Sequence, residues 1–431
     1  MNREMKHSGI EWIGNIPSDW RTDILSVLFY EHKLKNKGMV EQNLLSLSYG
    51  NIIRKDITQS GGLLPESFET YNIVDKNDII FRLTDLQNDK RSLRTGLCKE
   101  RGIITSAYIA IRKRTNIHAP YFHYLFHTYD LCKVFYGLGD GVRQGMNYAD
   151  MRKLPLIIPS YEEQKTIADF LDKKCSEIDE LVALQEKIIE ELKSYKQSVI
   201  TETVCKGLNP NAPMKDSGVE WIGEIPEDWQ IVRIKNVAEL YGRIGFRGYK
   251  SEDLNKEGIG AITLSPSNMK DFYMDYTNTT YLSWEKYYES PEIMINNDDI
   301  LLVKTGSSYG KVCYVSALPQ EATINPQILR VIPKIHNKYL CYILHSKGLK
   351  YQIECDVVGG TIPTISQEKI NNFFVPLCSE KEQQEIADYL DKKCSEIDQL
   401  ISIKQQKIVE LKDYKKSLIY EYTTGKKRVE A

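Results

Sequence analysis

The chain is 431 residues long, has a net charge of −2 at pH 7, and contains 27% charged residues. This length corresponds to roughly two to four domains, and the balanced composition excludes both a disordered chain and a protein that is basic overall. A surface for nucleic acid would therefore have to be local.

The cysteines and the apolar runs indicate in which cellular compartment the protein is expected. Nine cysteines are scattered without a C-x-x-C pair or a histidine at zinc-binding spacing, which favours a reducing environment and predicts no metal site. No stretch approaches the roughly 18 consecutive apolar residues of a membrane helix, and the N-terminus lacks the apolar run of a signal peptide. We expect a cytoplasmic protein that does not interact with membranes.

The chain contains a long internal repeat. Residues 8–20 (SGIEWIGNIPSDW) return as residues 217–229 (SGVEWIGEIPEDW), 209 residues later. Residues 167–181 (IADFLDKKCSEIDEL) return as residues 386–400 (IADYLDKKCSEIDQL), 219 residues later. A period this long indicates duplicated domains, because solenoid repeats run about 20–50 residues. The second intervening domain should therefore be ten residues longer than the first.

Between the two motifs of each copy, β-branched and aromatic runs alternate with Gly, Asn and Asp. Residues 77–81, 107–111 and 299–303 have the length and content of strands, and residues 121–136 and 337–352 have a helical pattern. Each copy thus predicts a compact α+β domain. We assign the tryptophans of the first motif to packing rather than to ligand contact: Trp12, Trp20, Trp221 and Trp229.

A long helix is predicted at the end of each copy. Ser160 with Glu163, and Ser379 with Glu382, have the spacing of capping boxes. The first helix has an apolar heptad seam, with Lys174 and Gln185 filling its gaps: Ile167, Leu171, Ile178, Leu181, Ile188, Leu192, Tyr195 and Val199. The second has the corresponding seam, with Lys393, Lys404 and Lys407 among its positions: Ile386, Leu390, Ile397, Leu400, Leu411, Tyr414 and Leu418.

These elements predict an α+β protein with an internal pseudo-two-fold repeat. Two mixed domains should be separated by two helices, each about 60 Å long, that pack as an antiparallel coiled coil and bury each other's apolar stripe. The expected boundaries are residues 1–157 for the first domain, 158–208 for the first helix, 209–376 for the second domain, and 377–431 for the second helix and tail.

Charge is unevenly distributed along the first copy. Residues 75–114 contain ten basic and five acidic side chains, whereas residues 162–196 contain ten acidic and six basic ones. A polyanion such as DNA should be attracted to the globular domain and repelled by the helix.

Signatures of catalysis are incomplete in this sequence. Residues 304–311 (KTGSSYGK) resemble a phosphate loop, but three residues separate the glycines where four are needed, and Val312 replaces the magnesium-binding hydroxyl. Nucleophile-elbow, paired-histidine and dinucleotide-binding patterns were also not found. Each half is therefore predicted to bind rather than to catalyse.

The doubled motifs resemble the specificity subunit of type I restriction–modification systems. The resemblance rests on the W-I-G tripeptides at residues 12–14 and 221–223, the Glu-Gln pairs at residues 163–164 and 382–383, and the two LDKKCSEID blocks. The second copy departs from the pattern at Cys378, where the first has Pro159.

The resemblance implies a non-catalytic protein with two target-recognition domains, each reading one half of a bipartite, asymmetric DNA sequence. It also implies spacer helices that dock two modification (methyltransferase) subunits, and restriction (translocase–nuclease) subunits that join for cleavage. S-adenosylmethionine, ATP and magnesium would be held by those partner subunits, and this chain would need no cofactor.

Site residues are predicted from loops with basic, amide or hydroxyl side chains. In the first domain the loops are residues 46–56, 82–94 and 140–147, and in the second they are 264–271, 304–311 and 359–365. The DNA-binding residues predicted from them are Asn51, Arg82, Arg91, Arg94, Arg143, Gln144, Asn268, Lys270, Lys304, Ser307, Ser308 and Lys311. The partner-binding residues predicted on the helices are Leu171, Ile178, Leu181, Leu390, Ile397 and Leu400.

Two alternatives remain open on sequence alone. One is a single-chain DNA methyltransferase with fused recognition domains, although we find no methyl-donor signature. The other is a non-catalytic coiled-coil assembly protein whose helices mediate association. The target bases and the spacing of the half-sites do not follow from the sequence, because no code links loop residues to base identity.

Overall fold

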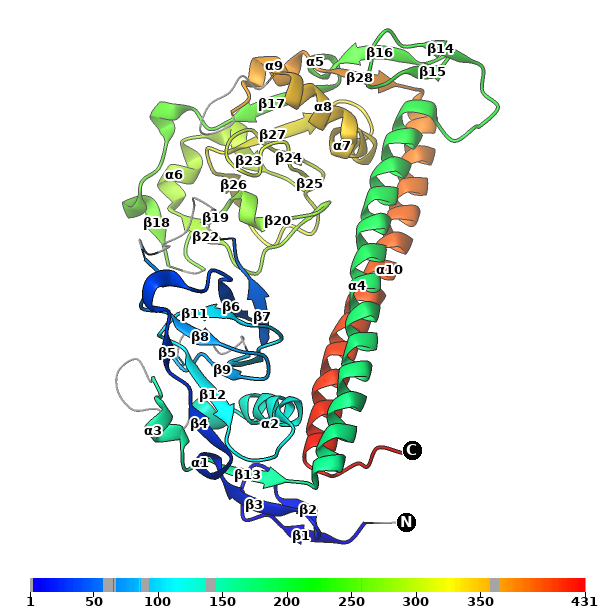
Figure 1. Ribbon diagram of the computed structural model, residues 1–431. Helices are drawn as coiled ribbons and strands as arrows, with labels where there is room; N and C mark the ends of the chain where they lie inside the picture. The colour runs from blue at the N-terminus through cyan, green and yellow to red at the C-terminus, as the bar shows by residue number, and fades with distance from the viewer. Residues whose placement is uncertain are drawn as a thin grey trace. The chain divides into compact units, whose positions relative to one another are not determined.

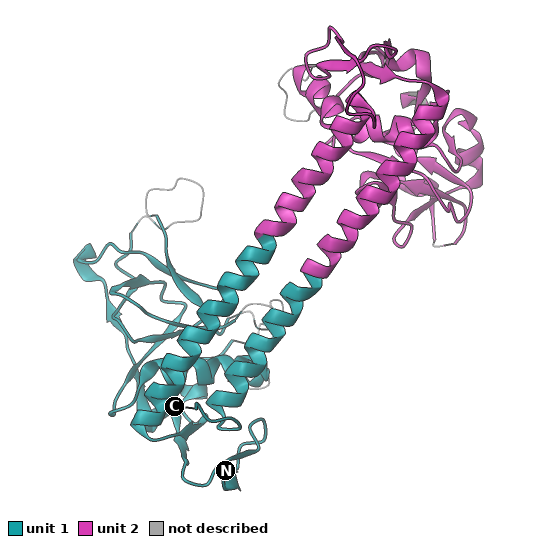
Figure 2. Cartoon of the chain, turned by 90° about the vertical axis from the view of Figure 1, so that its right-hand side faces the viewer, with its two compact units in different colours: residues 1–186, 405–431 teal, residues 187–404 magenta. Residues whose placement is uncertain are grey.

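The computed structural model describes residues 3–56, 65, 67–84, 86, 93–136, 145–256, 258–356 and 364–430 (Figure 1). The chain divides into two compact units (Figure 2). Unit 1 comprises Met1–Glu186 and Gln405–Ala431, and unit 2 comprises Lys187–Lys404. Both long helices, α4 (Tyr161–Lys206) and α10 (Glu380–Thr423), contribute to both units.

Unit 1 is a mixed α+β unit built on short strands. Its strands are β1 (Met5–His7), β2 (Asn15–Pro17), β3 (Arg21–Ile24), β4 (Phe29–Glu31), β5 (Leu34–Lys35), β6 (Leu45–Ser48), β7 (Asn51–Arg54), β8 (Asn72–Val74), β9 (Ile79–Phe81), β10 (Thr95–Leu97), β11 (Gly102–Ile104), β12 (Ile109–Lys113) and β13 (Pro155–Ile158). Its shorter helices are α1 (Leu25–Leu28), η1 (Lys37–Met39), α2 (Ala119–Leu131), η2 (Val134–Tyr136) and α3 (Tyr148–Met151).

The central sheet of unit 1 has the strand order β10-β9-β12-β4 and is antiparallel throughout. Ile79 and Phe81 join the core that also contains Phe122 and Phe126 of α2, whereas Ile80 packs in a second cluster on the opposite face with Leu45. Both faces of β9 are therefore covered, which explains why its residues form an uninterrupted apolar run. Unit 1 also has a three-stranded sheet, β11-β8-β5, the β6–β7 hairpin, and the two-stranded pairs β1-β2 and β13-β3 (Figure 1).

Unit 2 follows the same plan with larger sheets. Its strands are β14 (Met214–Asp216), β15 (Glu224–Pro226), β16 (Gln230–Arg233), β17 (Ala238–Gly242), β18 (Leu254–Asn255), β19 (Ala261–Leu264), β20 (Met269–Lys270), β21 (Tyr273–Met274), β22 (Thr280–Leu282), β23 (Met294–Ile295), β24 (Ile300–Val303), β25 (Val312–Tyr314), β26 (Ala322–Ile324), β27 (Ile328–Pro333) and β28 (Phe374–Leu377). Its shorter helices are α5 (Ile234–Val237), η3 (Gly245–Arg247), η4 (Ser251–Asp253), η5 (Pro266–Asn268), α6 (Trp284–Tyr288), η6 (Pro291–Ile293), α7 (Asn337–His345), α8 (Lys347–Asp356) and α9 (Gln367–Asn371).

The two large sheets of unit 2 have the orders β17-β27-β24-β25-β21-β20 and β18-β22-β19-β26-β23, and β14-β15 and β16-β28 form two-stranded pairs. The additional length of this copy lies between β17 and β24. Phe29 at the start of β4 corresponds to Ala238 of β17, 209 residues later, whereas Ile79 of β9 corresponds to Ile300 of β24, 221 residues later.

The two long helices run antiparallel in both units. In unit 1, Asp179 of α4 pairs with Lys415 of α10, and Glu186 pairs with Lys412. As the residue number rises along α4, the number of its partner on α10 falls, so the two helices run in opposite directions. At 1.5 Å per residue, helices of 46 and 44 residues are about 65–70 Å long. The predicted pair of long antiparallel helices is confirmed.

The predicted seam is right at every second position and wrong by one residue at the others. On α4, Leu171 and Ile178 are buried as predicted, but Cys175 and Val182 are buried where Lys174 and Leu181 were expected. The observed seam continues through Ile189 and Lys196, and it recurs 219 residues later on α10. Alternating steps of three and four residues fit both the predicted and the observed set of positions. The prediction chose the set with the larger apolar side chains, and that set is the more exposed one.

The helix starts differ in one detail from the predicted capping boxes. The Ser160 hydroxyl accepts from the Glu163 amide at 3.3 Å, but the Glu163 carboxylate accepts the indole N–H of Trp20 at 2.9 Å instead of returning to the cap. The second copy repeats this arrangement, since Glu382 accepts the indole N–H of Trp229 at 2.9 Å. Both tryptophans are buried, which confirms their structural assignment.

The glutamine that follows each of these glutamates joins its helix to the globular part of its unit. Gln164 accepts from the His118 amide at 2.9 Å, and Gln383 accepts from the His336 amide at 3.0 Å.

Among the described helices, none has the length and apolarity needed to cross a membrane.

Candidate nucleic-acid interface

The loops predicted to read DNA meet at the ends of the central strands in each unit. In unit 1, the Met146 amide donates to Leu83 O at 2.9 Å, which joins the third loop to the second. In unit 2, the Ile365 amide donates to Lys304 O at 2.9 Å. Residues 83 and 304, and residues 146 and 365, are equivalent in the repeat. The second and third predicted loops therefore lie together in each unit, while residues 137–144 and 357–363, which include part of each third loop, lie outside the described residues.

Unit 2 has a hydroxyl-rich hollow of about 210 Å³ between two of these loops. It is lined by Ser265, Pro266, Ser267, Thr305, Gly306, Ser307, Ser308 and Gln327. Hydroxyl and amide groups can donate to and accept from base edges and phosphate oxygens. The sequence predicted Ser307 and Ser308, and it placed Ser265 and Ser267 in a predicted loop without singling them out. Gln327 lies outside all the predicted loops.

The lysines around this hollow have different roles. The Lys311 ammonium donates to Met269 O at 2.5 Å and therefore supports the neighbouring loop. Lys270 is exposed, while Lys304 is half-buried, and burial lowers the pKa of Lys304. Within the part of unit 2 that the structure describes, Lys304 has no carboxylate within ion-pair distance. A phosphate oxygen would supply the missing partner.

Asn268 builds its loop instead of facing solvent. Its side chain is buried, accepts from the Ser265 amide at 3.0 Å, and donates to Asn278 O at 2.8 Å. These bonds use the amide that was predicted to read a base. The placement of Asn268 therefore supports a structural role, and a direct base contact would require the loop to open.

In unit 1, the predicted reader Asn51 lies at the start of β7, next to the tip of the β6–β7 hairpin. Ser48 pairs with Asn51, so Tyr49 and Gly50 form a two-residue turn, with φ of 44° and 83°. Turns of this type favour Asn and Gly, and a tyrosine with positive φ is uncommon. Tyr49 is 73% exposed, so the hairpin presents an aromatic ring to solvent beside Asn51.

The predicted arginines of unit 1 fall into two groups. Arg82 is half-buried at the end of β9 and stays a predicted contact. Arg94 is fully buried, and its guanidinium donates to Thr84 O at 3.2 Å and lies 5.9 Å from the Tyr136 ring. This placement leaves Arg94 no direct access to DNA. Three further predicted residues lie outside the described residues: Arg91, Arg143 and Gln144.

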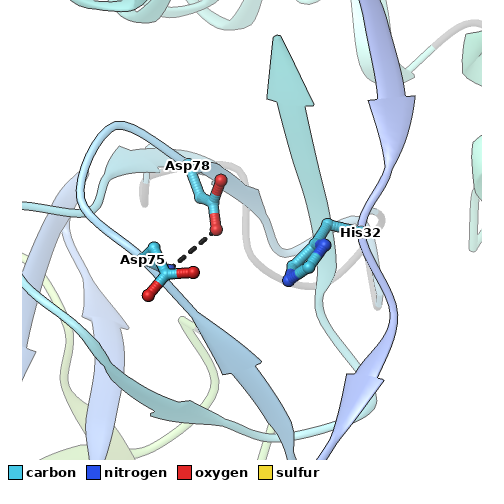
Figure 3. A group of neighbouring side chains, drawn as sticks. All are labelled: His32, Asp75 and Asp78. Atoms are coloured by element: carbon cyan, nitrogen blue, oxygen red, sulfur yellow. Dashed lines mark hydrogen bonds between the residues drawn. The ribbon is translucent and has the colours of Figure 1, made fainter. Parts of the chain in front are cut away.

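The basic stretch of unit 1 is partly neutralised by its own acids. His32, Asp75 and Asp78 are close enough to suggest a metal site, with candidate ligand atoms within 4.8 Å of one another (Figure 3). However, Arg112 donates to Asp75 and to Asp78 at 2.7 Å, and Arg101 donates to Asp75 at 2.9 Å. A cation would have to displace Arg112. We therefore interpret the group as a salt-bridge network that braces β8 and β12.

The six predicted partner-binding residues divide by the phase of the helical seam. Leu171, Ile178, Leu390 and Ile397 are buried in the chain's own cores, so an external partner cannot reach them in this structure. Leu181 and Leu400 are both 47% exposed and stay candidates for partner contact.

The exposed apolar side chains of the helices are repeated in the two copies. Leu181 is matched by Leu400. Two further pairs are absent from the predicted partner-binding residues: Leu184 with Ile403, and Tyr195 with Tyr414, which the sequence placed in the seams. Every member of these pairs is exposed. Each unit thus has a similar set of exposed apolar helix residues, here called its apolar helix face: Leu181, Leu184 and Tyr414 in unit 1, and Leu400, Ile403 and Tyr195 in unit 2.

Comparisons with known proteins agree with this repeated plan. Residues 29–194 and 226–413 match the family described as "Type I restriction modification DNA specificity domain". The chain is 26% identical, over 83% of its length and 80% of the relative, to the type I restriction enzyme MjaVIII specificity subunit of Methanocaldococcus jannaschii. It is 27% identical, over 97% and 96%, to the putative type I restriction enzyme MjaX specificity subunit of the same organism.

The fold is also found among solved structures. A chain from a structural study of complex assembly and conformational transition of the type I R-M system matches with a TM-score of 0.70 and 16% identity, over 95% of this chain and 99% of that one. At that identity the likeness concerns the fold. The two sequence matches to one family model cover most of the protein, and the chain therefore belongs to the type I restriction–modification DNA specificity family.

Proposed function

We propose that this chain is the sequence-specific DNA-binding subunit of a type I restriction–modification complex, and that each unit reads one half of a bipartite, asymmetric target. The observation that carries the proposal is the doubled arrangement of loops. In each unit, equivalent loops meet at the ends of the central strands, while the side chains they carry differ. Equivalent scaffolds with different readers suit a target with two different halves.

The proposed recognition regions are residues 1–157 and 209–376, with residues 158–208 and 377–431 acting as spacers. The retained contacts between each tryptophan and its helix support this division, because they fix each recognition region on a helix start. The spacers would set the distance between the half-sites. Lengthening both helices by two heptads should change the spacing of the methylated motif and leave its bases unchanged; altered bases would contradict the division.

The repeated apolar helix faces are the proposed docking sites for two modification subunits. Their matched composition suits two copies of one partner, since identical partners need equivalent surfaces. Replacing Leu181 and Leu184 with serine should weaken assembly at one site, and the same change at Leu400 and Ile403 should weaken it at the other. Counting bound modification subunits by native mass spectrometry would test both, and unchanged stoichiometry in both variants would contradict the assignment.

We further propose that the chain itself is non-catalytic and acts in the cytoplasm. The modification subunits would supply S-adenosylmethionine, and the restriction subunits would supply ATP-dependent translocation and magnesium-dependent cleavage. Equilibrium dialysis of the purified chain with labelled S-adenosylmethionine should give no specific binding. Saturable binding would favour a single-chain methyltransferase.

Methylome sequencing tests the proposed function most broadly. Cells expressing the chain with its modification partner should acquire one bipartite methylated motif with an unspecified central gap. Cells expressing the partner alone should acquire none. A single continuous motif, or a motif that does not depend on this chain, would contradict the proposal.

A further inference from the structure

The β20–β21 hairpin of unit 2 is attached to the long helices by a buried lysine. Lys196 of α4 is only 6% exposed, and its ammonium donates to Asp271 at 2.6 Å and to Asp398 of α10 at 2.8 Å. Asp271 lies at the hairpin turn, and His345 at the end of α7 reaches it at 3.5 Å. We call these four residues the lysine clamp: Lys196, Asp271, His345 and Asp398.

Within the clamp, the lysine ammonium depends on its carboxylate partners because it is the group that is buried from water. Asp271 is 60% exposed and Asp398 is 51% exposed, so both keep contact with water while the ammonium does not. Hydrogen bonding from His345, followed by that from Lys196, holds the pKa of Asp271 well below its usual range. Although burial lowers the pKa of Lys196, its bonds to the two carboxylates raise it overall, so the Lys196 ammonium is charged at neutral pH.

Three further contacts fix the hairpin turn. The Asp271 carbonyl accepts from the Cys313 thiol at 3.2 Å, and the Phe272 carbonyl accepts from the Tyr314 amide at 2.8 Å. The Phe272 ring stacks on Tyr342 of α7 at 4.5 Å. The turn of the hairpin is therefore held by the long helices and α7 through its side chains, and by β25 through its backbone carbonyls.

The other end of this short segment forms the hydroxyl-rich hollow. Ser265 and Ser267 line the hollow, and only a few residues separate them from Asp271. Lys311 supports the segment between them through Met269 O. Movement of the hairpin tip would thus be transmitted to the serines that face Ser307 and Ser308.

Unit 1 offers a natural comparison because its equivalent lysine lacks the second carboxylate partner. Lys415 occupies the position of Lys196 in the repeat and pairs with Asp179, the equivalent of Asp398, at 2.6 Å. In the described part of unit 1, Asp179 is the only carboxylate within ion-pair distance of Lys415. The turn of the β6–β7 hairpin lies beside His127, the equivalent of His345 in the repeat, and is therefore the equivalent turn; it carries Tyr49 and Gly50, which have no carboxylate to offer.

We propose that Lys196 is a positioning residue for DNA reading by unit 2, holding the β20–β21 hairpin on the long helices and thereby fixing the hydroxyl-rich hollow. The inference rests on the proposed function, because it concerns how unit 2 reads its half-site. Lys196 itself does not contact DNA, and its equivalent Lys415 has no such role in unit 1.

The test compares matched variants of the complex assembled with its modification partner. Binding is measured to the intact target and to duplexes with one half-site scrambled, and the half read by unit 2 is identified by exchanging residues 209–376. Lys196→Met should reduce discrimination at that half about tenfold, comparable to losing one or two base contacts, and leave the other half unchanged. Asp271→Asn should act in the same direction, whereas Lys196→Arg should retain wild-type discrimination.

Lys415→Met is the matched control and should leave discrimination at both halves unchanged. Equal losses at both halves with Lys196→Met, or the same loss with Lys415→Met, would indicate a general structural role and overturn the proposal. Unchanged discrimination with Lys196→Met would overturn it as well.

Hydrogen exchange separates failure of the clamp from failure of the proposed function. In the full-length chain, Lys196→Met should accelerate amide exchange at least tenfold in β20 and β21, and Lys415→Met should leave β6 and β7 unchanged. Unaltered exchange in β20 and β21 would overturn the clamp. If Lys196→Met accelerates exchange in β20 and β21 but the wild-type complex shows no half-site preference, the clamp is retained and the proposed function is rejected.

Discussion

The β6–β7 hairpin of unit 1 and the β20–β21 hairpin of unit 2 occupy equivalent places, but charge fastens only the second to the long helices. Asp271 meets Lys196 in unit 2, whereas Tyr49 in unit 1 faces solvent. The contacts between the shorter helix and the long helix are the same in both units: Tyr124 of α2 donates to Asp172 of α4, and Tyr342 of α7 donates to Asp391 of α10, each at 2.7 Å. After the duplication, the framework contacts stayed fixed while the hairpin tips diverged.

The largest expected effect tests the shared framework. Replacing Trp20 or Trp229 with alanine removes a buried ring and leaves a glutamate without its indole donor. Each change should lower the free energy of unfolding by about 3–5 kcal/mol. Denaturant unfolding followed by circular dichroism measures it. A cost below about 1 kcal/mol for either variant would show that the two units do not depend on the same contact.

A pH effect should distinguish the units. Burial lowers the pKa of His127 in unit 1 to about 4, below the value of about 6.5 in an unfolded chain. As pH falls from 7 to 5, the unfolded chain binds a proton that the folded unit rejects, so unit 1 should lose about 2 kcal/mol of stability. His127→Gln should remove this loss. An unchanged pH dependence of unfolding in that variant would contradict the prediction.

The helix caps should contribute equally to the two copies. Ser160 and Ser379 each accept a hydrogen bond from a first-turn amide, so replacement by alanine should cost about 1 kcal/mol in each case. Thermal unfolding of the two variants measures this. A difference of more than about 1 kcal/mol between them would show that the helix starts have diverged as the hairpins have.

The smallest expected effect concerns the hairpin tip of unit 1. Tyr49→Asn places a residue that tolerates positive φ in the turn and should stabilise the protein by roughly 0.5 kcal/mol. If Tyr49 stacks on DNA, the same variant should bind its target more weakly by about 1–3 kcal/mol. Tyr49→Phe is the control, because it keeps the ring. Wild-type affinity in Tyr49→Asn would exclude stacking.

The sequence predicted the repeat, the two mixed units and the antiparallel helices because these depend on patterns that persist over many residues. It predicted the phase of the helical seam less well. Leu181 and Tyr195 are more apolar than Lys196, yet Lys196 is the buried residue because Asp271 and Asp398 neutralise it. A pairing partner 75 residues away leaves no signal in a heptad pattern.

The candidate site was predicted at the level of loops but not of individual side chains. Asn268 and Arg94 have the chemistry of base readers, and both are buried in bonds that support their own loops. Ser265 lines the hollow but was not singled out within its predicted loop, and Gln327 lines it from outside the predicted loops. Which polar side chain faces outward depends on the local path of the backbone, and composition does not reveal it.

The account depends most on the claim that each unit reads its own half of the target. The direct measurement is methylome sequencing after residues 209–376 are exchanged for the recognition region of another family member, with its modification partner present. We expect one half of the bipartite motif to change while the other half and the spacing stay constant. Changes in both halves, or none in either, would contradict the account.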